Sequence, residues 1–286
     1  MTKFIKLEGS LFTVDHIKKY DEIYTAVALN VLERGIAEKA NIIVFPEYMI
    51  TKSIENKIVK YLIEHRDNYP WLMFVVAGSQ WVSEGDFTNN VSSVFNSTGQ
   101  LLGKTYKFSE YASYEIGSLI EKSVDNYTER LINPGKEILI LDIERVGRFA
   151  FAICRDVCDE GINSLTDRIV SVFRPDFLIV PAWSRSIQRA FNKKFKNYAS
   201  QGVVSILCNC CEAIDSDSIV RSLVGYPVKK NIKSKYLSGE TKSIECLEIK
   251  NGKECHQNQC LFFIDIDLTE NNLTQGSVCQ YIQQSD

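Results

Sequence analysis

The chain has 286 residues, of which 45% are hydrophobic and 24% are charged, and its formal net charge is −3. These values are ordinary for a soluble globular protein, and a chain of this length can bury a full core without disulfides or a metal. A small negative charge provides no basic field for nucleic acid or for an anionic membrane, so we expect neither as a partner.

Helical and strand-like patterns alternate through the first half of the chain. Residues 1–8 carry charges where a signal peptide needs an apolar core, which predicts a cytoplasmic, reducing location. Apolar residues recur at helical spacing in 20–40 and 54–65, and short apolar runs indicate strands at 42–45 and 71–77. The turn 97–99 separates 91–96 from 100–106, which predicts a β-hairpin, and the polar segment 109–126 predicts a loop with some helix.

The second half continues the alternation. Residues 138–143 and 148–153 predict a strand pair, and the other predicted elements are helices at 161–173 and 186–201 and strands at 177–181, 203–209 and 261–267. Residues 228–260 are polar with weak periodicity, and we interpret them as an atypical insertion or excursion, with a hairpin as one form of it. The basic stretch 229–235 fits a solvated loop, and a phosphate- or carboxylate-bearing partner is the alternative. Together these patterns predict one α/β domain with mixed sheets over residues 1–286.

Nine cysteines are a high number for a chain expected in a reducing compartment. An odd total is a poor disulfide framework. The groups at 208–211 and 255–260 could be read as a zinc site, but their spacing matches no closed structural zinc pattern well. We therefore expect reduced thiols that mostly act as small buried hydrophobes, and no metal or other cofactor.

Three chemically complementary residues each follow a strand-like run. Cys154 ends the apolar run 147–154, Glu47 follows 41–46, and Lys107 follows 101–106. A thiol needs a base or a nearby positive charge to become a nucleophile at neutral pH, and Glu47 and Lys107 supply these two groups. The backbone N–H of Arg155 could add an oxyanion donor. None of the three histidines follows such a strand-like run, so a carboxylate is the expected base.

Each residue alone has a more ordinary explanation: a core thiol, a surface carboxylate and a solvated lysine. The combination favours acyl transfer, because the motifs resemble those of a known family. Residues 43–48, 103–107 and 152–156 resemble, in order, the three signature segments of the carbon–nitrogen hydrolase (nitrilase) superfamily. Residues 129–135 resemble the segment that carries a second active-site glutamate, and 178–183 resemble the strand that lines the pocket. The resemblance covers residues 22–228.

The resemblance implies an αββα sandwich with mixed sheets, which pairs into αββα–αββα dimers with a four-layered α-β-β-α arrangement. It implies a Glu-Lys-Cys triad without metal or cofactor, in which Cys154 attacks the substrate and Glu47 activates the hydrolytic water. Glu129 would then orient Lys107 or the substrate nitrogen. Tyr48, Arg155 and Trp183 are the expected substrate-binding residues, with core packing as the alternative for Trp183.

The chain departs from the family pattern at three places. Residues 4–13 lack the glutamine usual in a short first strand, Phe108 and Ser109 replace a common His-Leu pair, and the segment after 221–227 is basic and cysteine-rich where a short turn is common. These departures leave the substrate and the assembly open.

The leading functional hypothesis is a hydrolase that cleaves the C–N bond of a small amide or carbamoyl compound through a thioester, with a nitrile as a less favoured substrate. It would act as a homodimer or higher homo-oligomer. The alternative is a nitrilase-like regulatory or interaction module of a larger multi-component system, which the unusual first strand and late segment favour. A third possibility, N-acyl transfer, would need an amine acceptor site that the sequence does not reveal.

Overall fold

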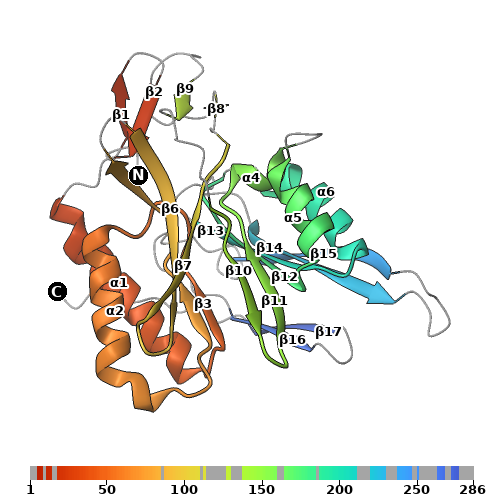
Figure 1. Cartoon of the computed structure of the whole chain (residues 1–286), viewed down its shortest axis with the longest axis horizontal. Coiled ribbons are helices and arrows are strands. Elements are labelled where there is room, and N and C mark those ends of the chain that lie inside the picture. Colours follow the sequence, from red (N-terminus) through yellow and green to blue (C-terminus); the bar gives the residue numbers. More distant parts are fainter. Residues whose placement is uncertain are drawn as a thin grey trace. The chain divides into compact units, whose positions relative to one another are not determined.

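The protein divides into two compact units, Met1–Ile138 and Leu139–Asp286. They are known from a computed structural model, which describes residues 5–8, 11–14, 18–84, 87–109, 112–113, 127–129, 137–159, 164–184, 187–210, 220–229, 237–246, 250, 263–267 and 272–276. In the first unit, helices α1 (Lys18–Ala37) and α2 (Lys52–His65) accompany a mixed sheet. Its strands are β3 (Ile42–Val44), β4 (Phe74–Val76), β5 (Gln80–Glu84), β6 (Phe87–Asn96) and β7 (Leu101–Tyr106) (Figure 1).

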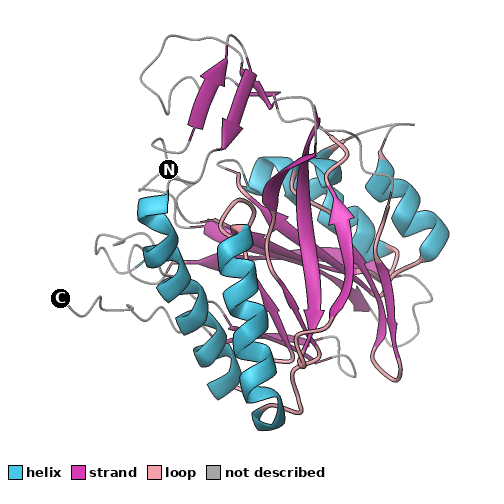
Figure 2. Ribbon diagram, turned by 60° about the vertical axis from the view of Figure 1, so that its left-hand side comes forward, coloured by secondary structure: helices cyan, strands magenta, loops and turns pink. Residues whose placement is uncertain are grey.

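The sheet of the first unit has the order β3-β4-β6-β5, and β7 pairs with β6. Strands β3 and β4 are parallel, whereas β6 runs antiparallel to β4, β5 and β7. Figure 2 shows α1 and α2 side by side along one face of this sheet. The predicted hairpin is therefore present as β6 and β7, while β5 had no counterpart in the sequence analysis.

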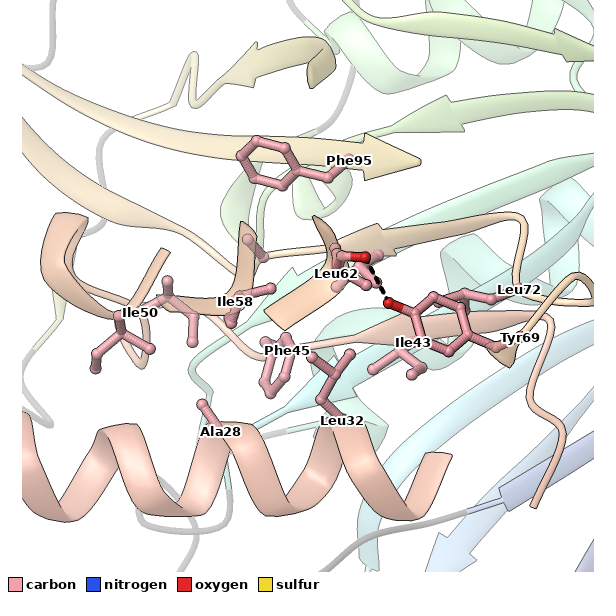
Figure 3. Packing of buried hydrophobic residues seen from close by; sticks show 13 residues of the cluster. Ala28, Leu32, Ile43, Phe45, Ile50, Ile58, Leu62, Tyr69, Leu72 and Phe95 are labelled. Atoms are coloured by element: carbon pink, nitrogen blue, oxygen red, sulfur yellow. Dashed lines mark hydrogen bonds between the residues drawn. The ribbon is translucent and has the colours of Figure 1, made fainter. Parts of the chain in front are cut away.

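The core of the first unit lies between these helices and the sheet. Ala28 and Leu32 on α1 are four residues apart, as are Ile54, Ile58 and Leu62 on α2, so each set forms one apolar stripe. Both stripes belong to one cluster with Phe45, and the Tyr69 hydroxyl within it donates to the Leu62 carbonyl over 2.7 Å (Figure 3). Thr51 begins α2, because its hydroxyl accepts a hydrogen bond from the Ile54 amide.

A small separate sheet in the first unit contains the amino-terminal residues. Strands β1 (Ile5–Glu8) and β2 (Leu11–Val14) form an antiparallel pair, β2 runs parallel to β9 (Tyr127–Glu129), and β9 pairs with β8 (Ala112–Ser113). Of the segment 109–126, expected to be a loop with some helix, 110–111 and 114–126 lie outside the described residues, and 112–113 are strand β8.

The second unit is built on a mixed sheet with the order β10-β11-β12-β13-β14-β15. The central strands β11 to β13 are parallel, and the outer strands are antiparallel to their neighbours. The strands are β10 (Ile140–Ile143), β11 (Gly147–Phe151), β12 (Phe177–Ala182), β13 (Val204–Asn209), β14 (Val220–Lys229) and β15 (Leu237–Glu245). All residues of β12 are buried, which explains its continuous apolar sequence.

Helices α4 (Arg155–Cys158), α5 (Leu165–Phe173) and α6 (Ile187–Ser200) lie together on one side of this sheet (Figure 1). The prediction of an α/β fold with mixed sheets is confirmed. Within 228–260, residues 237–245 form β15 and pair with β14 in the main sheet. The late strand is present as β16 (Phe263–Asp267), which pairs with β17 (Asn272–Gly276). No helix in the described part of the chain is both long and apolar enough for a membrane span.

Helix α6 approaches the sheet closely at two glycines. A Cβ atom on Gly225 would lie 2.8 Å from the Cβ of Phe195, and one on Gly239 would lie 2.7 Å from the carbonyl carbon of Lys196 and 2.9 Å from the Ser200 nitrogen. Backbone atoms of a helix cannot move aside as a flexible side chain can. The absence of a side chain at Gly239 therefore sets the distance between α6 and β15.

We predict that Gly239→Ala lowers the free energy of unfolding by about 1–3 kcal/mol, because the added methyl group overlaps the α6 backbone. Chemical denaturation monitored by circular dichroism would measure the change. Ser243→Ala on the same strand is the control, with an expected change within about 0.5 kcal/mol. Equal stability of Gly239→Ala and the wild type would contradict this packing.

Candidate active site

Glu47 and Lys107 form a buried ion pair in the first unit. The Lys107 Nζ donates to Glu47 Oε1 over 2.8 Å, and both side chains are 1% exposed. The Nδ2 of Asn90 donates to the same oxygen over 2.9 Å. A carboxylate and an ammonium removed from water are stable only when they are well paired and hydrogen-bonded, and this site provides both.

The backbone holds Glu47 beyond the end of β3. The Tyr48 amide donates to the Ser79 carbonyl over 2.9 Å, and Glu47 and Ser79 form a parallel bridge. Gly78 permits this approach: its φ is +60°, and a Cβ there would meet the Pro46 backbone, with the Pro46 carbonyl carbon only 3.2 Å away. Glu47 therefore extends the pairing of β3 with β4 by a few residues.

Lys107 directly follows β7. Its amide donates to the Asn90 carbonyl over 2.9 Å, so the same residue on β6 anchors the backbone of Lys107 and the carboxylate of Glu47. The Tyr48 hydroxyl lies 3.4 Å from the Lys107 Nζ, and the centre of the Tyr48 ring lies 5.6 Å away. The structure thus brings together Glu47, Tyr48 and Lys107, all of which the sequence had singled out.

Asn90 is the member of this cluster that sequence reasoning missed. It is completely buried, and its neighbours Asn89, Ser92 and Ser93 on β6 are also buried. The sequence signal for Asn90 was the run of polar residues in β6, which do not alternate with apolar ones and lie between apolar residues. A strand with one exposed face has polar residues at every second position, and β6 does not. Its buried polar side chains are therefore expected to form hydrogen bonds within the protein.

Cys154 lies at the carboxyl end of a parallel strand in the second unit, as predicted. It follows β11, and its amide donates to the Pro181 carbonyl over 3.0 Å. Its backbone has φ 45° and ψ −104°, a conformation that a residue with a side chain rarely adopts. Such strain costs about 1–3 kcal/mol and persists only where the surroundings enforce it.

The surroundings of Cys154 supply that enforcement. Asp156 is 2% exposed, and its Oδ2 accepts from the Ile153 amide over 3.4 Å, while Thr166 Oγ1 donates to the Asp156 carbonyl over 2.8 Å. The Cys154 thiol is 4% exposed and lies 3.7 Å from the Trp183 carbonyl oxygen, which accepts from it. A reverse turn between β11 and α4 therefore presents the thiol at the edge of the sheet.

The other residues proposed from sequence have distinct environments. Trp183 follows β12 and is 5% exposed. Arg155 begins α4, and its exposed side chain lies 3.3 Å from Asp159 in an ion pair. Glu129 ends β9, and its backbone pairs with Phe12, but its side chain lies outside the described part of the structure.

The described cysteines other than Cys154 form no disulfide among the described residues. Burial raises the pKa of Cys158 to about 12, with a smaller opposing effect of Arg155, and burial raises the pKa of Cys208 to about 12. Cys210 and Cys246 are also buried and unbridged. Among the described residues, no three His, Cys, Asp or Glu side chains gather in a way that could hold a metal. Cys211, Cys255, Cys260 and Cys279 lie outside those residues.

No family model and no curated protein matches the sequence. Solved structures do match the fold. Nit3 of Saccharomyces cerevisiae, described as a member of branch 10 of the nitrilase superfamily, has a TM-score of 0.50 at 16% identity, and the match covers 81% of this chain and 87% of Nit3. The chain has the fold of the carbon–nitrogen hydrolase, or nitrilase, superfamily.

Two further structures extend this comparison. A glutamine-dependent NAD+ synthetase from Acinetobacter baumannii matches with a TM-score of 0.51 at 14% identity, over 92% of this chain but 46% of the synthetase. An amidase from Nesterenkonia sp. matches at 12% identity and a TM-score of 0.49, over 78% of this chain and 83% of the amidase. Nearly the whole nitrilase-like chain thus corresponds to less than half of the synthetase.

We predict that Lys107→Met lowers the free energy of unfolding by about 3–5 kcal/mol, because it leaves the Glu47 carboxylate buried without a counterion. The double variant Glu47→Gln/Lys107→Met should lose less than the sum of the single changes, with a coupling energy of about 0.5–3 kcal/mol. Urea denaturation of the four proteins would measure this cycle. Lys104→Met, at an exposed position on β7, is the matched control, and strict additivity of the two changes would contradict the ion pair.

Proposed function

We propose that the protein is a cysteine-dependent hydrolase that cleaves the C–N bond of a small amide or carbamoyl compound through a thioester. The observation that carries this proposal is the strained backbone of Cys154 at the end of a parallel strand. Strain of this kind is concentrated at functional sites, and the position is the one that the family resemblance gives to the nucleophile. The likeness to a glutamine-dependent synthetase adds support, since glutamine carries a carboxamide.

In the proposed reaction, Glu47 accepts the proton of the Cys154 thiol, and the thiolate attacks the carbonyl carbon. The negative charge on the carbonyl oxygen is stabilised by Lys107 and by the amide of Arg155. The C–N bond breaks, and the nitrogen leaves as ammonia or an amine after it receives the proton from Glu47. Water then loses a proton to Glu47 and attacks the thioester, which releases the carboxylic acid and restores the thiol.

The remaining residues have supporting roles in this proposal. Glu129 orients Lys107 or the substrate nitrogen. Tyr48, Arg155 and Trp183 contact the substrate, and the packing of the Tyr48 ring and hydroxyl near the Lys107 ammonium supports a role for it in shaping the pocket. The reaction requires neither metal nor organic cofactor.

We predict that Cys154→Ala and Cys154→Gly both abolish turnover, since the group that forms the thioester is missing. Cys154→Gly should in addition be more stable than Cys154→Ala by about 1 kcal/mol or more, because glycine adopts φ 45° without strain. Activity assays on a panel of small amides and nitriles, together with thermal unfolding, would measure both effects. Turnover of Cys154→Ala within about tenfold of wild type, or 1.4 kcal/mol in barrier, would exclude the thiol as nucleophile.

Covalent trapping provides the direct readout of this prediction. Incubation with the same amides and nitriles near pH 8, followed by intact and peptide mass spectrometry, should give an adduct on Cys154. Cys158 and Cys208 are internal controls, because a pKa of about 12 keeps both thiols protonated at that pH and their labelling should begin only as the pH approaches 12.

The second candidate function is a nitrilase-like regulatory or interaction module of a larger system. The observation that favours it is the synthetase match, in which 92% of this chain corresponds to 46% of a larger protein.

The hydrolase proposal includes the four-layered αββα–αββα homodimer of the family and a cytoplasmic location. We predict a homodimer or higher homo-oligomer by light scattering at micromolar concentration. A monomer without any Cys154 adduct would favour the module.

A further inference from the structure

Glu55 is a buried carboxylate that the proposed reaction does not use. It lies in the first turn of α2, and its side chain is 3% exposed. Its Oε2 accepts a hydrogen bond from the Nε2 of Gln80 over 2.8 Å, and its Oε1 is paired with the ammonium of Lys52. Gln80 is itself buried. A buried carboxylate is unfavourable unless it is paired and hydrogen-bonded, so these two contacts stabilise Glu55 in its place between α2 and β5.

Gln80 begins β5 directly beyond an irregularity in the sheet. Val76 is paired with Val94 on β6, and Gln80 is paired with Val91. The strand that runs from β4 into β5 therefore has one residue more than β6 over this stretch, which makes it a β-bulge. The extra residue is accommodated around Gly78, whose φ is +60°. Bulges occur often beside functional sites, where they redirect a side chain.

The bulge contains Ser79, which holds the backbone of Glu47. Glu47 forms a parallel bridge with Ser79, and the Tyr48 amide donates to the Ser79 carbonyl over 2.9 Å. Successive residues of a strand point to opposite faces of its sheet. Gln80 therefore points toward α2, while Ser79 points to the face on which Glu47 pairs with Lys107.

Segment 47–55 is thus fixed at both ends by two consecutive residues. Glu47 at one end is bridged to Ser79, and Glu55 at the other end is hydrogen-bonded to Gln80. Within the segment, Tyr48 has a φ of 63°, which a residue with a bulky side chain rarely adopts. Such a conformation persists only where the surroundings enforce it, and a segment fixed at both ends provides that enforcement.

We propose that Glu55 and Gln80 are positioning residues for Glu47. Their hydrogen bond fixes the bulge to α2, and the bulge in turn holds the Glu47 carboxylate against Lys107. The effect on turnover rests on the proposed function, in which Glu47 is the base, whereas the effect on the ion pair rests on the geometry alone. A displaced base transfers protons slowly while the binding of the substrate is largely retained, so the expected signature is a lower kcat at an unchanged KM.

The test replaces Glu55 by leucine, which removes the acceptor, and by glutamine, whose carbonyl oxygen can still accept from Gln80. With the best amide substrate of the wild type, Glu55→Leu should lower kcat by at least about tenfold and keep KM within about twofold. Glu55→Gln should keep kcat within about threefold of the wild type, because it retains the hydrogen bond. Assays well below the lowest melting temperature exclude a loss of folded protein as the cause.

The coupling between Glu47 and Lys107 provides a readout that does not need turnover. The double-mutant cycle of Glu47→Gln and Lys107→Met, measured by urea denaturation, is repeated in the Glu55→Leu and Glu55→Gln backgrounds. The coupling should lose at least about half of its wild-type value in Glu55→Leu and persist in Glu55→Gln. A residue that serves stability alone would lower the free energy of unfolding and leave this coupling intact.

Glu64→Leu is the matched control on the same helix. Glu64 lies 3.7 Å from Lys60 in an exposed ion pair. Exposed pairs contribute little, so this change should keep both kcat and the coupling within about twofold of the wild type. If Glu55→Leu does not fold, Gln80→Met removes the same hydrogen bond from the other side and replaces it, with the same expected results.

The outcomes separate this inference from the proposed function. An unchanged coupling in Glu55→Leu overturns the positioning role, whether or not the wild type hydrolyses amides. An unchanged kcat in an active enzyme also overturns it, as does an equal loss in Glu55→Gln, whose side chain can still accept from Gln80. A reduced coupling in a protein without amide turnover supports the positioning of Glu47 and rejects the hydrolase.

Discussion

The buried ion pair between Glu47 and Lys107 is the interaction on which the first unit's organisation depends. Both charges are removed from water, so each needs the other as its counterion. Three structural features meet that requirement: the pairing of Glu47 with Ser79 beyond β3 and β4, the positive φ of Gly78 beside Pro46, and the two contacts of Asn90. The apolar cluster between the sheet and helices α1 and α2 packs against β3 and β4.

In the second unit, the main constraint is the strained backbone of Cys154 rather than a buried ion pair. Cys154 is forced into an unfavourable conformation by the hydrogen bond of its amide to Pro181 and by the cap that Asp156 forms on the Ile153 amide. A tight turn of this kind leads directly from β11 into α4 and leaves the Cys154 thiol buried against the Trp183 carbonyl. The four buried or partly buried cysteines elsewhere in the described chain have no such turn, and for two of them burial raises the thiol pKa to about 12.

Sequence patterns predicted much of the fold because most elements are either strongly amphipathic helices or short apolar strands. Strand β12 is buried on both faces, and its sequence is continuously apolar, so its prediction was direct. Strand β5 and helix α4 were missed because one alternates weakly and the other has only four residues, too few to show a period. The strand β14 was missed because its apolar residues are interrupted by Arg221 and Ser222, which read as surface residues.

The same reasoning explains which candidate site residues could be identified from the sequence. Glu47, Lys107 and Cys154 were visible because each follows an apolar run and carries chemistry that a family pattern recognises. Asn90 and Arg221 were not, since a single polar residue inside a strand does not reveal its own burial, although the unalternating polar run of β6 was a signal for Asn90. Their hydrogen bonds differ: Asn90 Nδ2 and Lys107 Nζ both donate to Glu47, whereas Nε and Nη2 of Arg221 have no partner among the described residues. Lys107 thus shows how the chain accommodates a buried cation, by pairing it with a carboxylate that a neighbouring strand also holds through a hydrogen bond.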